Sequence, residues 1–186
     1  MKIAFVAAIA ACTLFLAFPL AAAEVAGVSM PAKLEVGGKQ LTLNGMGLRS
    51  KAIFKVYVAG LYAENGSSDA GRIIAGDQTK QVRLVMMRSL DRAAISDAVE
   101  EGFQKNSARQ MPILRERLDT FLAPIPDLKS GDELVITYVP GRGTSLSTRT
   151  AILVTVPGKD FADAIFSVWL GANPVDAKLK AALLGG

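Results

Sequence analysis

The sequence predicts an α+β domain in which helices pack on an antiparallel sheet. Three observations predict it. The first third of the chain has short runs rich in β-branched and aromatic residues, the middle third has apolar residues at helical spacing, and two further strands and two further helices follow. Strands and helices that come in blocks, rather than in strict alternation, are typical of this class. The chain shows no internal repeat and no linker that would divide it.

The N-terminal residues 1–23 predict a cleavable signal peptide. Met1-Lys2 is positive, Ile3–Leu20 is apolar and uncharged, and Ala21-Ala22-Ala23 precedes the first acidic residue. A positive start, an apolar stretch and a small-residue cleavage site are typical of secretory signals. We therefore expect cleavage after Ala23, a periplasmic or secreted location, one domain over residues 24–186, and no stable membrane span after cleavage.

The same segment has two other interpretations. The apolar run is about long enough for a transmembrane anchor, and Ile9-Ala10-Ala11-Cys12 loosely resembles a lipoprotein cleavage site. Pro19 and the alanine cluster favour cleavage over an anchor, and the apolar stretch before Cys12 is too short for a lipoprotein signal.

Composition excludes several classes of chemistry. The 186 residues include no histidine, and the one cysteine, Cys12, lies in the segment expected to be removed. This excludes Ser-His-Asp and Cys-His nucleophiles, histidine general bases and Cys/His zinc sites, and we expect neither metal nor cofactor. All 17 acidic residues and 20 of the 21 Lys and Arg residues follow Ala23, which gives a net charge of +3. That mild charge does not indicate a nucleic-acid partner. The sequence leaves the oligomeric state open.

The first strands are predicted from turn residues and β-rich runs. Gly37-Gly38 separates Lys33–Val36 from Lys39–Leu43, which is typical of a two-residue hairpin. Phe54–Tyr62 and Gln81–Met87 are rich in β-branched, aromatic and other apolar residues and predict two more strands.

The middle of the chain predicts helices. Ser68 can cap a short helix that ends at Ala75. From Asp91 onward, apolar or small residues recur at helical spacing and predict a helix with one buried face; they are Ile95, Ala98, Val99, Gly102 and Phe103. Pro112 opens a second helix, which Pro124 ends.

The last third predicts two strands and two helices. A glycine-containing loop joins Glu133–Val139 to Thr150–Val156, and the second strand is apolar on both faces, so we expect it in a central, doubly covered position. A helix follows from about Asp160 to Leu170. The last helix is expected to have Asn173 as its N-cap and Pro174 as its first residue.

Three segments are candidate binding sites. In Asn44–Lys51, expected to join two strands, Arg49 has the planar fork that suits a carboxylate or phosphate. The simpler interpretation of this segment is a solvated turn with a surface salt bridge. Tyr57 lies in the middle of an expected strand. Its side chain should share one face with Lys55 and Ala59, while Phe54, Val56 and Val58 take the other face. Either the tyrosine packs on the sheet, or its hydroxyl joins Arg49 in holding a carboxylate. The loop Pro140–Thr144 lacks phosphate-loop spacing, so we interpret it as a hairpin loop.

Several segments together resemble the bacterial branch of the chalcone isomerase-like family. They are LTLNGMGLRSKAIFKVYVAGLYAE at 41–64, the stretch 82–103, and VWLGANPVDAKLKAALLG at 168–185. The pairing of G-x-G-x-R with F-K-V-Y-x-A-G-L-Y carries most of the resemblance, and W-x-G-x-x-P supports it. The resemblance implies an open-faced β-sandwich, in which a large antiparallel sheet has helices packed on one side.

The resemblance also implies where the catalytic residues of the plant enzymes would fall. Arg49 matches the family's arginine, and Tyr57 stands where the plant enzymes have a threonine that polarises the ketone through water. At three other positions the plant enzymes have polar residues and this chain does not. Ile95 stands where they have the catalytic tyrosine, Ala98 where they have a lysine, and Gly102 where they have an asparagine.

This pattern is more similar to the non-catalytic relatives that bind fatty acids in plastids and hold the carboxylate with an arginine and a tyrosine. It implies an exported, non-catalytic binder of a small amphipathic carboxylate, with Arg49 and Tyr57 as the clamp and no catalytic residue. Two alternatives stay open. One is an isomerase or intramolecular lyase for an unknown enone-like substrate, with Arg49 stabilising an enolate-like charge. The other is a structural envelope protein without a small ligand.

Overall fold

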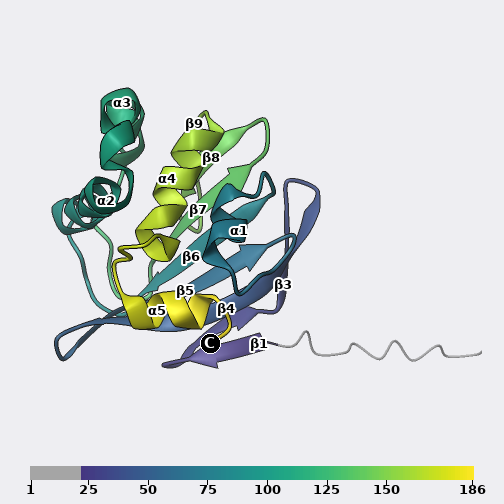
Figure 1. The fold of residues 1–186 in the computed structure, drawn as a ribbon. Coiled ribbons are helices and arrows are strands. Elements are labelled where there is room, and N and C mark those ends of the chain that lie inside the picture. Colours follow the sequence, from purple (N-terminus) through teal and green to yellow (C-terminus); the bar gives the residue numbers. More distant parts are fainter. Residues whose placement is uncertain (1–21) are drawn as a thin grey trace, which may run out of the picture.

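The chain folds around one curled antiparallel sheet with helices on one face (Figure 1). The structure is a computed structural model that describes residues 22–186, so nearly all of the predicted signal peptide lies outside the described residues. The seven strands follow one another in chain order across the sheet. They are β3 (Lys33–Val36), β4 (Lys39–Lys51), β5 (Phe54–Ala63), β6 (Lys80–Met86), β7 (Glu133–Val139), β8 (Gly143–Ser147) and β9 (Ile152–Val156).

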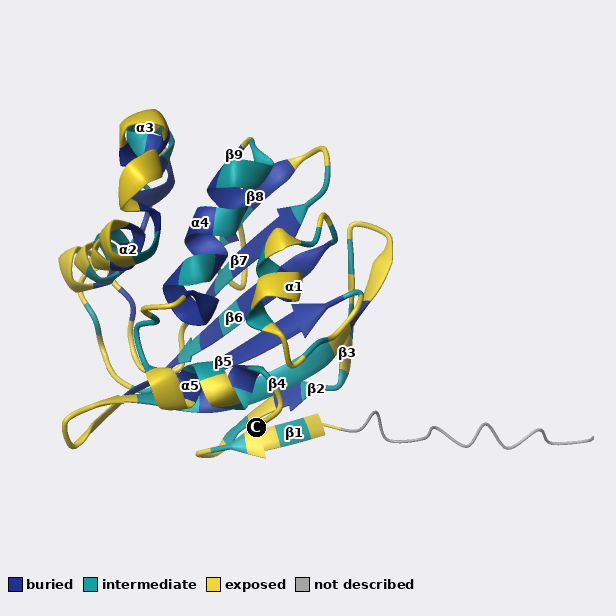
Figure 2. Cartoon of the chain, in the orientation of Figure 1, coloured by how far each residue is buried: buried dark blue, intermediate teal, exposed yellow. Residues whose placement is uncertain are grey.

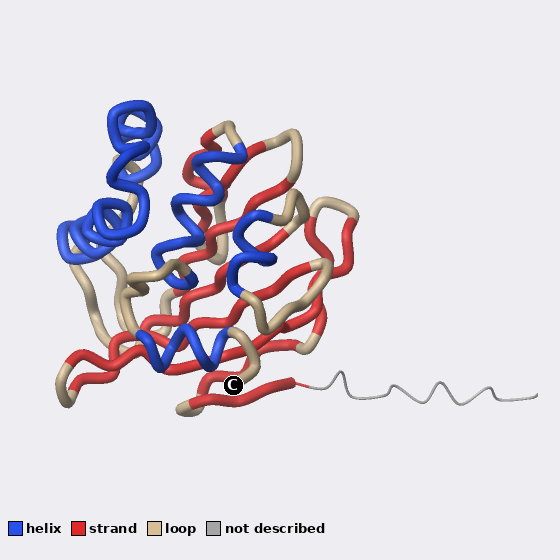
Figure 3. The backbone as a smooth tube through the Cα atoms, in the orientation of Figure 1, coloured by secondary structure: helices blue, strands red, loops and turns tan. Residues whose placement is uncertain are grey.

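The helices gather on one side of this sheet, as Figure 3 shows by secondary structure. Their apolar residues and one face of the sheet form a single large core. In Figure 2 most helices carry both buried and exposed residues, whereas the helix Lys159–Leu170 carries no exposed residue. They are α1 (Ala70–Ala75), α2 (Arg92–Ser107), the 3-10 helix η1 (Ala108–Gln110), α3 (Met111–Leu122), α4 (Lys159–Leu170) and α5 (Ala177–Leu183).

A two-stranded hairpin, β1 (Ala22–Val25) and β2 (Val28–Pro31), covers part of the opposite face. Met30 from β2 is buried against Val58 and Tyr62 from β5 in a second, smaller core. The hydroxyl of Tyr62 donates a hydrogen bond to the carbonyl oxygen of Pro31 at 2.9 Å. Alternate side chains of β5 therefore enter different cores, as the period of a strand requires.

The segment Asn44–Lys51 is part of β4 and does not join two strands, so that prediction was wrong. Its glycines permit close packing instead of a flexible loop. A Cβ atom on Gly45 would lie 2.2 Å from the carbonyl oxygen of Ala182, and one on Gly47 would lie 2.7 Å from the Ala182 Cβ. The two glycines therefore let α5 lie directly on β4, which fixes the strand that carries Arg49.

The predicted central position of the last strand was also wrong, because β9 is an edge strand. The stretch expected to be a loop contains β8, whose sequence GTSLS is too polar to be recognised by hydropathy. Because β8 pairs with β7, it displaces β9 to the edge, where Ile152 is 70% exposed. The apolar character of β9 reflects its packing under α3.

Two helix starts differ from the prediction, although the helices exist. The cap of α1 is Asp69 rather than Ser68, and its carboxylate accepts from the backbone N–H of Gly71 at 2.8 Å. The cap of α5 is Asp176 rather than Asn173, and it accepts from the N–H of Leu179 at 2.9 Å. The predicted start of α2 at Asp91 is confirmed, because the Asp91 side chain accepts from Ala94 N.

Candidate functional site

A cavity of about 430 Å³ lies between the sheet and the helices. Its size falls in the range of small-molecule sites in proteins, about 300–1,000 Å³. Most of its lining is apolar, with Tyr57 and five charged side chains added. The lining residues are Arg49, Lys51, Phe54, Val56, Tyr57, Leu84, Met86, Arg88, Leu90, Ala94, Ile95, Asp97, Ala98, Val99, Glu101, Phe121, Ile125, Leu134, Ile136, Leu146, Ile165, Val168, Trp169 and Val175.

Arg49 and Tyr57 meet in the wall of this cavity. They are direct cross-strand partners on β4 and β5, and the Arg49 guanidinium carbon lies 5.5 Å from the centre of the Tyr57 ring. That distance is typical of a cation–π contact. Within the described residues, no carboxylate lies within ion-pairing distance of Arg49. Its charge is thus available to a ligand.

A β-bulge aims several β5 side chains at the cavity. The register shifts between Arg49 and Ser50, which pair with Tyr57 and Lys55, so Val56 is the extra residue. A bulge changes which face the neighbouring side chains take. Val56 and Phe54 therefore line the cavity together with Tyr57. Their predicted place on the opposite face was wrong, because strict alternation does not hold across a bulge.

The Tyr57 hydroxyl is held by a buried hydrogen bond. The indole Nε1–H of Trp169 on α4 donates to Tyr57 Oη at 2.9 Å. Burial raises the pKa of Tyr57 above its ordinary value, and the nearby Arg49 lowers it in part. Burial is the larger effect, so the hydroxyl stays protonated at neutral pH. Because Oη already accepts from Trp169, its own proton remains for an acceptor on a ligand.

The mouth of the cavity is cationic on one side and acidic on the other. Lys51 and Arg88 are exposed at the β4–β5 side, and the Arg88 guanidinium carbon lies 4.9 Å from the centre of the Phe54 ring. Asp97 and Glu101 come from α2. Lys105 pairs with Glu101 at 2.5 Å and is the main reason that the pKa of this carboxyl lies below its ordinary value.

A second, polar cavity of about 270 Å³ adjoins the first. Arg49 and Lys51 line both cavities, and Lys105 and Asn173 line only the second. Arg49 therefore stands at the boundary between an apolar space and a polar one, where the charged head of an amphipathic molecule would lie.

The three positions matched to plant catalytic residues lie in or beside these cavities. Ile95 and Ala98 line the apolar cavity, and Gly102 lines the polar one. Gly102 also allows a close approach of two helices, because a Cβ atom there would lie 2.8 Å from Cγ1 of Val168 on α4. A larger side chain at position 102 would thus need α2 and α4 to move apart.

Sequence reasoning found two of the wall residues and missed others. The expected pair Arg49 and Tyr57 is brought together, and Met86 also lines the cavity. Met87 packs on the opposite face of the sheet. The role of Trp169 as partner of Tyr57 was missed, because the two residues lie 112 positions apart. The approach of Arg88 to Phe54 also had no signal in the sequence.

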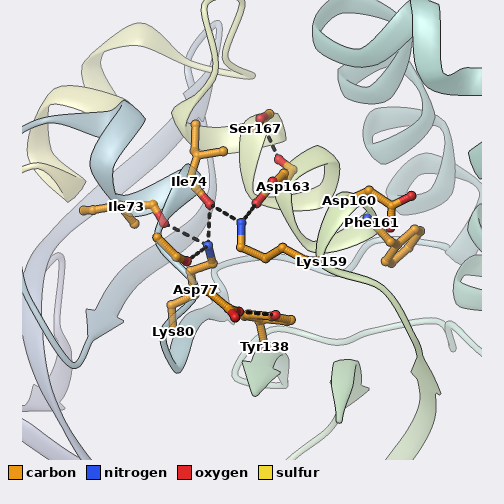
Figure 4. Close-up of polar contacts among 11 residues, drawn as sticks. Ile73, Ile74, Asp77, Lys80, Tyr138, Lys159, Asp160, Phe161, Asp163 and Ser167 are labelled. Carbon is orange, nitrogen blue, oxygen red and sulfur yellow. Dashed lines mark hydrogen bonds and ion pairs between the residues drawn. The ribbon is translucent and has the colours of Figure 1, made fainter. Parts of the chain in front are cut away.

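A second cluster of titratable groups lies away from the cavity (Figure 4). The buried ammonium of Lys80 donates to the carbonyl oxygens of Ile73, Ile74 and Gly76, at 2.8, 2.6 and 3.1 Å, and so caps the C-terminal end of α1. Lys159 also donates to the Ile74 carbonyl and pairs with Asp163. The Lys80 contacts are structural, because its side chain has no exposed surface.

The described residues bring together no metal site and no membrane-spanning helix. Within 22–186, no group of three or more His, Cys, Asp or Glu side chains is placed to hold a metal ion. No helix of this part combines the length and apolar character that crossing a bilayer requires.

Comparison with known proteins supports the resemblance seen in the sequence. The family model described as chalcone isomerase-like matches residues 22–185. A fatty-acid binding protein from Arabidopsis thaliana has a similar structure, with a TM-score of 0.69 and 18% sequence identity over 89% of this chain and 100% of that one. No curated protein gives a significant sequence match. The fold and the family model together place the chain in the chalcone isomerase-like family.

Proposed function

We propose that this chain is an exported, non-catalytic binding protein for a small amphipathic carboxylate of the fatty-acid class. The observation that carries the proposal is the pairing of Arg49 with the Tyr57 hydroxyl in the wall of an apolar cavity. A carboxylate beside this pair receives charge-assisted hydrogen bonds from the guanidinium and one from the hydroxyl. The structural neighbour named as a fatty-acid binding protein supports this reading.

The tail and the head of such a ligand contribute differently. Burying about ten methylene groups stabilises the complex by roughly 8 kcal/mol before the cost of association. One hydrogen bond to a charged group contributes about 1.5–3 kcal/mol. The tail therefore supplies most of the affinity, and the Arg49–Tyr57 pair fixes the orientation and selects a carboxylate.

The residues opposite the pair support binding without catalysis. Ile95 and Ala98 on α2 present only hydrocarbon to the cavity, and Gly102 presents no side chain. A general acid or base must reach the reacting atoms with a titratable group. The helix face that carries such groups in the plant enzymes offers none at these three positions.

An intramolecular lyase or isomerase is the second candidate. Arg49 and the Tyr57 hydroxyl could stabilise an enolate-like oxygen as well as a carboxylate, because both are donors at the edge of an apolar space. This candidate predicts turnover of an enone substrate that disappears in Arg49→Ala. A structural envelope protein without a ligand would not need a cavity with a charged wall.

Native mass spectrometry with lipid extraction tests the binding proposal. Protein purified from its own host is expected to carry a fatty acid or a related acid, and Arg49→Ala is expected to carry much less. Arg142→Ala is the matched control, because Arg142 is an exposed arginine in the β7–β8 turn. A wild-type protein without any acid, together with unchanged fatty-acid affinity in Arg49→Ala, would overturn the proposal.

Export rests on the N-terminal residues 1–23 alone. Mass measurement of the protein isolated from its host tests it, and we expect the chain to begin at Glu24. A chain that retains Met1-Lys2 would contradict cleavage.

A further inference from the structure

The hairpin between β4 and β5 ends in an exposed apolar tip. Ala52 and Ile53 form its turn, because Lys51 pairs directly with Phe54. Ile53 is 89% exposed and Phe54 is 54% exposed. Figure 1 shows this hairpin in blue, extending beyond the body of the sheet below α2, and Figure 2 colours its turn as exposed. Two adjacent large apolar side chains at a protruding turn are unusual for a surface that meets only water.

Cations without acidic partners surround this tip. Lys51 and Lys55 flank the turn, and Arg88 lies over the Phe54 ring. Within the described residues none of the three has a carboxylate within ion-pairing distance. The sequence from Val36 to Ala63 contains no Asp or Glu. The tip therefore combines apolar surface with three cations that form no ion pair in the described part of the chain, although Asp97 and Glu101 lie across the cavity mouth.

The exposed Ile113 has a different environment. Ile113 on α3 is 68% exposed, but the nearby Arg117, which donates to the Ile113 carbonyl, is paired with Asp160 at 2.6 Å. Exposed apolar surface at Ile113 is thus accompanied by neutralised charge. Of these two sites, the β4–β5 tip has the chemistry of a lipid-binding element, in which apolar side chains enter the acyl boundary while cations meet anionic headgroups.

We propose that the β4–β5 tip docks the protein on an anionic lipid surface, with Ile53 and Phe54 inserted and Lys51, Lys55 and Arg88 at the headgroups. The tip is also the rim of the cavity, because Lys51, Phe54 and Arg88 line both. A docked protein therefore opens its apolar cavity next to the bilayer. Docking stands on the hairpin alone, whereas exchange of an acyl ligand with the bilayer rests on the proposed function.

The two kinds of contact predict separate responses. Removing one exposed lysine near an anionic surface lowers vesicle affinity by about fivefold, and the effect declines with salt. Replacing Ile53 by serine lowers it by about tenfold, because most of a fully exposed isoleucine side chain enters the boundary. Ile53 and Lys55 do not line the cavity, so neither change alters the cavity wall.

A local probe separates docking by the tip from binding by the N-terminal apolar segment. The full chain with Ile53→Trp is mixed with vesicles of phosphatidylglycerol and phosphatidylcholine that carry bromine on their acyl chains. Bromine quenches only tryptophan that reaches the acyl region. The native Trp169 is 3% exposed but lines the cavity, so its own quenching is measured in the wild-type protein and subtracted. Ile113→Trp is the matched control, because Ile113 on α3 is also largely exposed, at 68%.

We expect quenching at position 53, little at position 113, and a rightward shift of the vesicle titration by about fivefold when Lys55→Gln is added. Absence of quenching at position 53, or equal quenching at both positions, would overturn the docking proposal. A self-association that Ile53→Ser abolishes, without quenching at position 53, would assign the tip to a second copy of this chain instead. Fatty-acid affinity measured without vesicles tests the proposed function separately.

Discussion

Trp169 donates its indole N–H to the Tyr57 hydroxyl at 2.9 Å and thereby joins α4 to the middle of β5. The bond fixes the direction in which Tyr57 offers its own proton, because one acceptor site on the oxygen is occupied. Trp169 is the only tryptophan in the chain and lines the cavity. Its fluorescence therefore reports directly on a molecule that enters the site, and it serves as the readout for the first two predictions.

Arg49→Ala is expected to lower the affinity for a long-chain fatty acid by about 10–100-fold. The change removes hydrogen bonds from a charged donor, which contribute about 1.5–3 kcal/mol. Titration of Trp169 fluorescence measures the affinity, and Arg142→Ala provides an exposed arginine with no place in the cavity as the control. Equal affinities of wild type and Arg49→Ala would show that the arginine does not contact the ligand.

Tyr57→Phe is expected to lower both affinity and stability. The ligand loses one hydrogen-bond donor, which reduces affinity by about tenfold, and the buried indole N–H of Trp169 loses its acceptor, which costs about 1–3 kcal/mol of unfolding free energy. The matched control is Tyr62→Phe, whose hydroxyl bonds to Pro31 on the opposite face of the sheet. It should lower stability and leave affinity unchanged. A loss of affinity in both variants would mean that the effect is only structural.

The architecture could be predicted from the sequence because its signals are local. The paired glycines at positions 37 and 38 mark a hairpin that the structure confirms, with Val36 directly opposite Lys39. The apolar stripe from Ile95 to Phe103 lies on the buried face of α2. Strand β8 could not be predicted, because it owes its place to backbone pairing between β7 and β9 rather than to its polar side chains.

The site could be predicted only in part, because its geometry depends on contacts between distant segments. Arg49 and Tyr57 are close in the sequence, and their juxtaposition follows once a hairpin is assumed. The Val56 bulge has no sequence marker, although it decides which side chains of β5 face the cavity. The role of Gly45 and Gly47 depends on α5, which follows more than 120 residues later.

Gly102→Ala is expected to destabilise the fold although alanine is the better helix former. The substitution gains about 1 kcal/mol of helix propensity. The new Cβ atom would lie within 3.1 Å of three Val168 side-chain atoms, and such overpacking costs about 1–3 kcal/mol. We therefore expect a net loss of up to about 2 kcal/mol in denaturant unfolding.

The double variant Gly102→Ala/Val168→Ala provides the control for this effect. Removing the valine methyl groups makes room for the Cβ atom, so the two changes should be less harmful together than the sum of each alone. If the stability losses of the two substitutions simply add, the strain does not arise from the contact between positions 102 and 168. The same contact predicts that asparagine, the residue of the plant enzymes, fits position 102 only if α2 and α4 separate.

Lys80 is a second place where burial and charge compete. It is fully buried, and its ammonium lies 5.4 Å from the Tyr138 ring centre and 5.3 Å from that of Phe166. Burial is the main reason that the pKa of Lys80 falls from 10.5 to about 8. Lys159 lowers it further, while Asp163 and Asp77 raise it in part.

This lowered pKa predicts that stability rises with pH between about 8 and 10.5. In that interval the unfolded chain binds a proton at Lys80 that the folded chain has released, so the free energy of unfolding increases with pH. Lys80→Met removes this dependence and leaves the carbonyl groups of Ile73 and Gly76 without this donor, while the Ile74 carbonyl keeps Lys159. The loss costs about 1–3 kcal/mol at pH 7. Urea unfolding of wild type and Lys80→Met at pH 7, 8, 9 and 10 measures the effect. The contributions of the other titrating groups cancel when the two unfolding free energies are subtracted at each pH. The difference in unfolding free energy between wild type and Lys80→Met should increase with pH. A constant or decreasing difference would mean that the three carbonyl groups keep the Lys80 ammonium charged throughout.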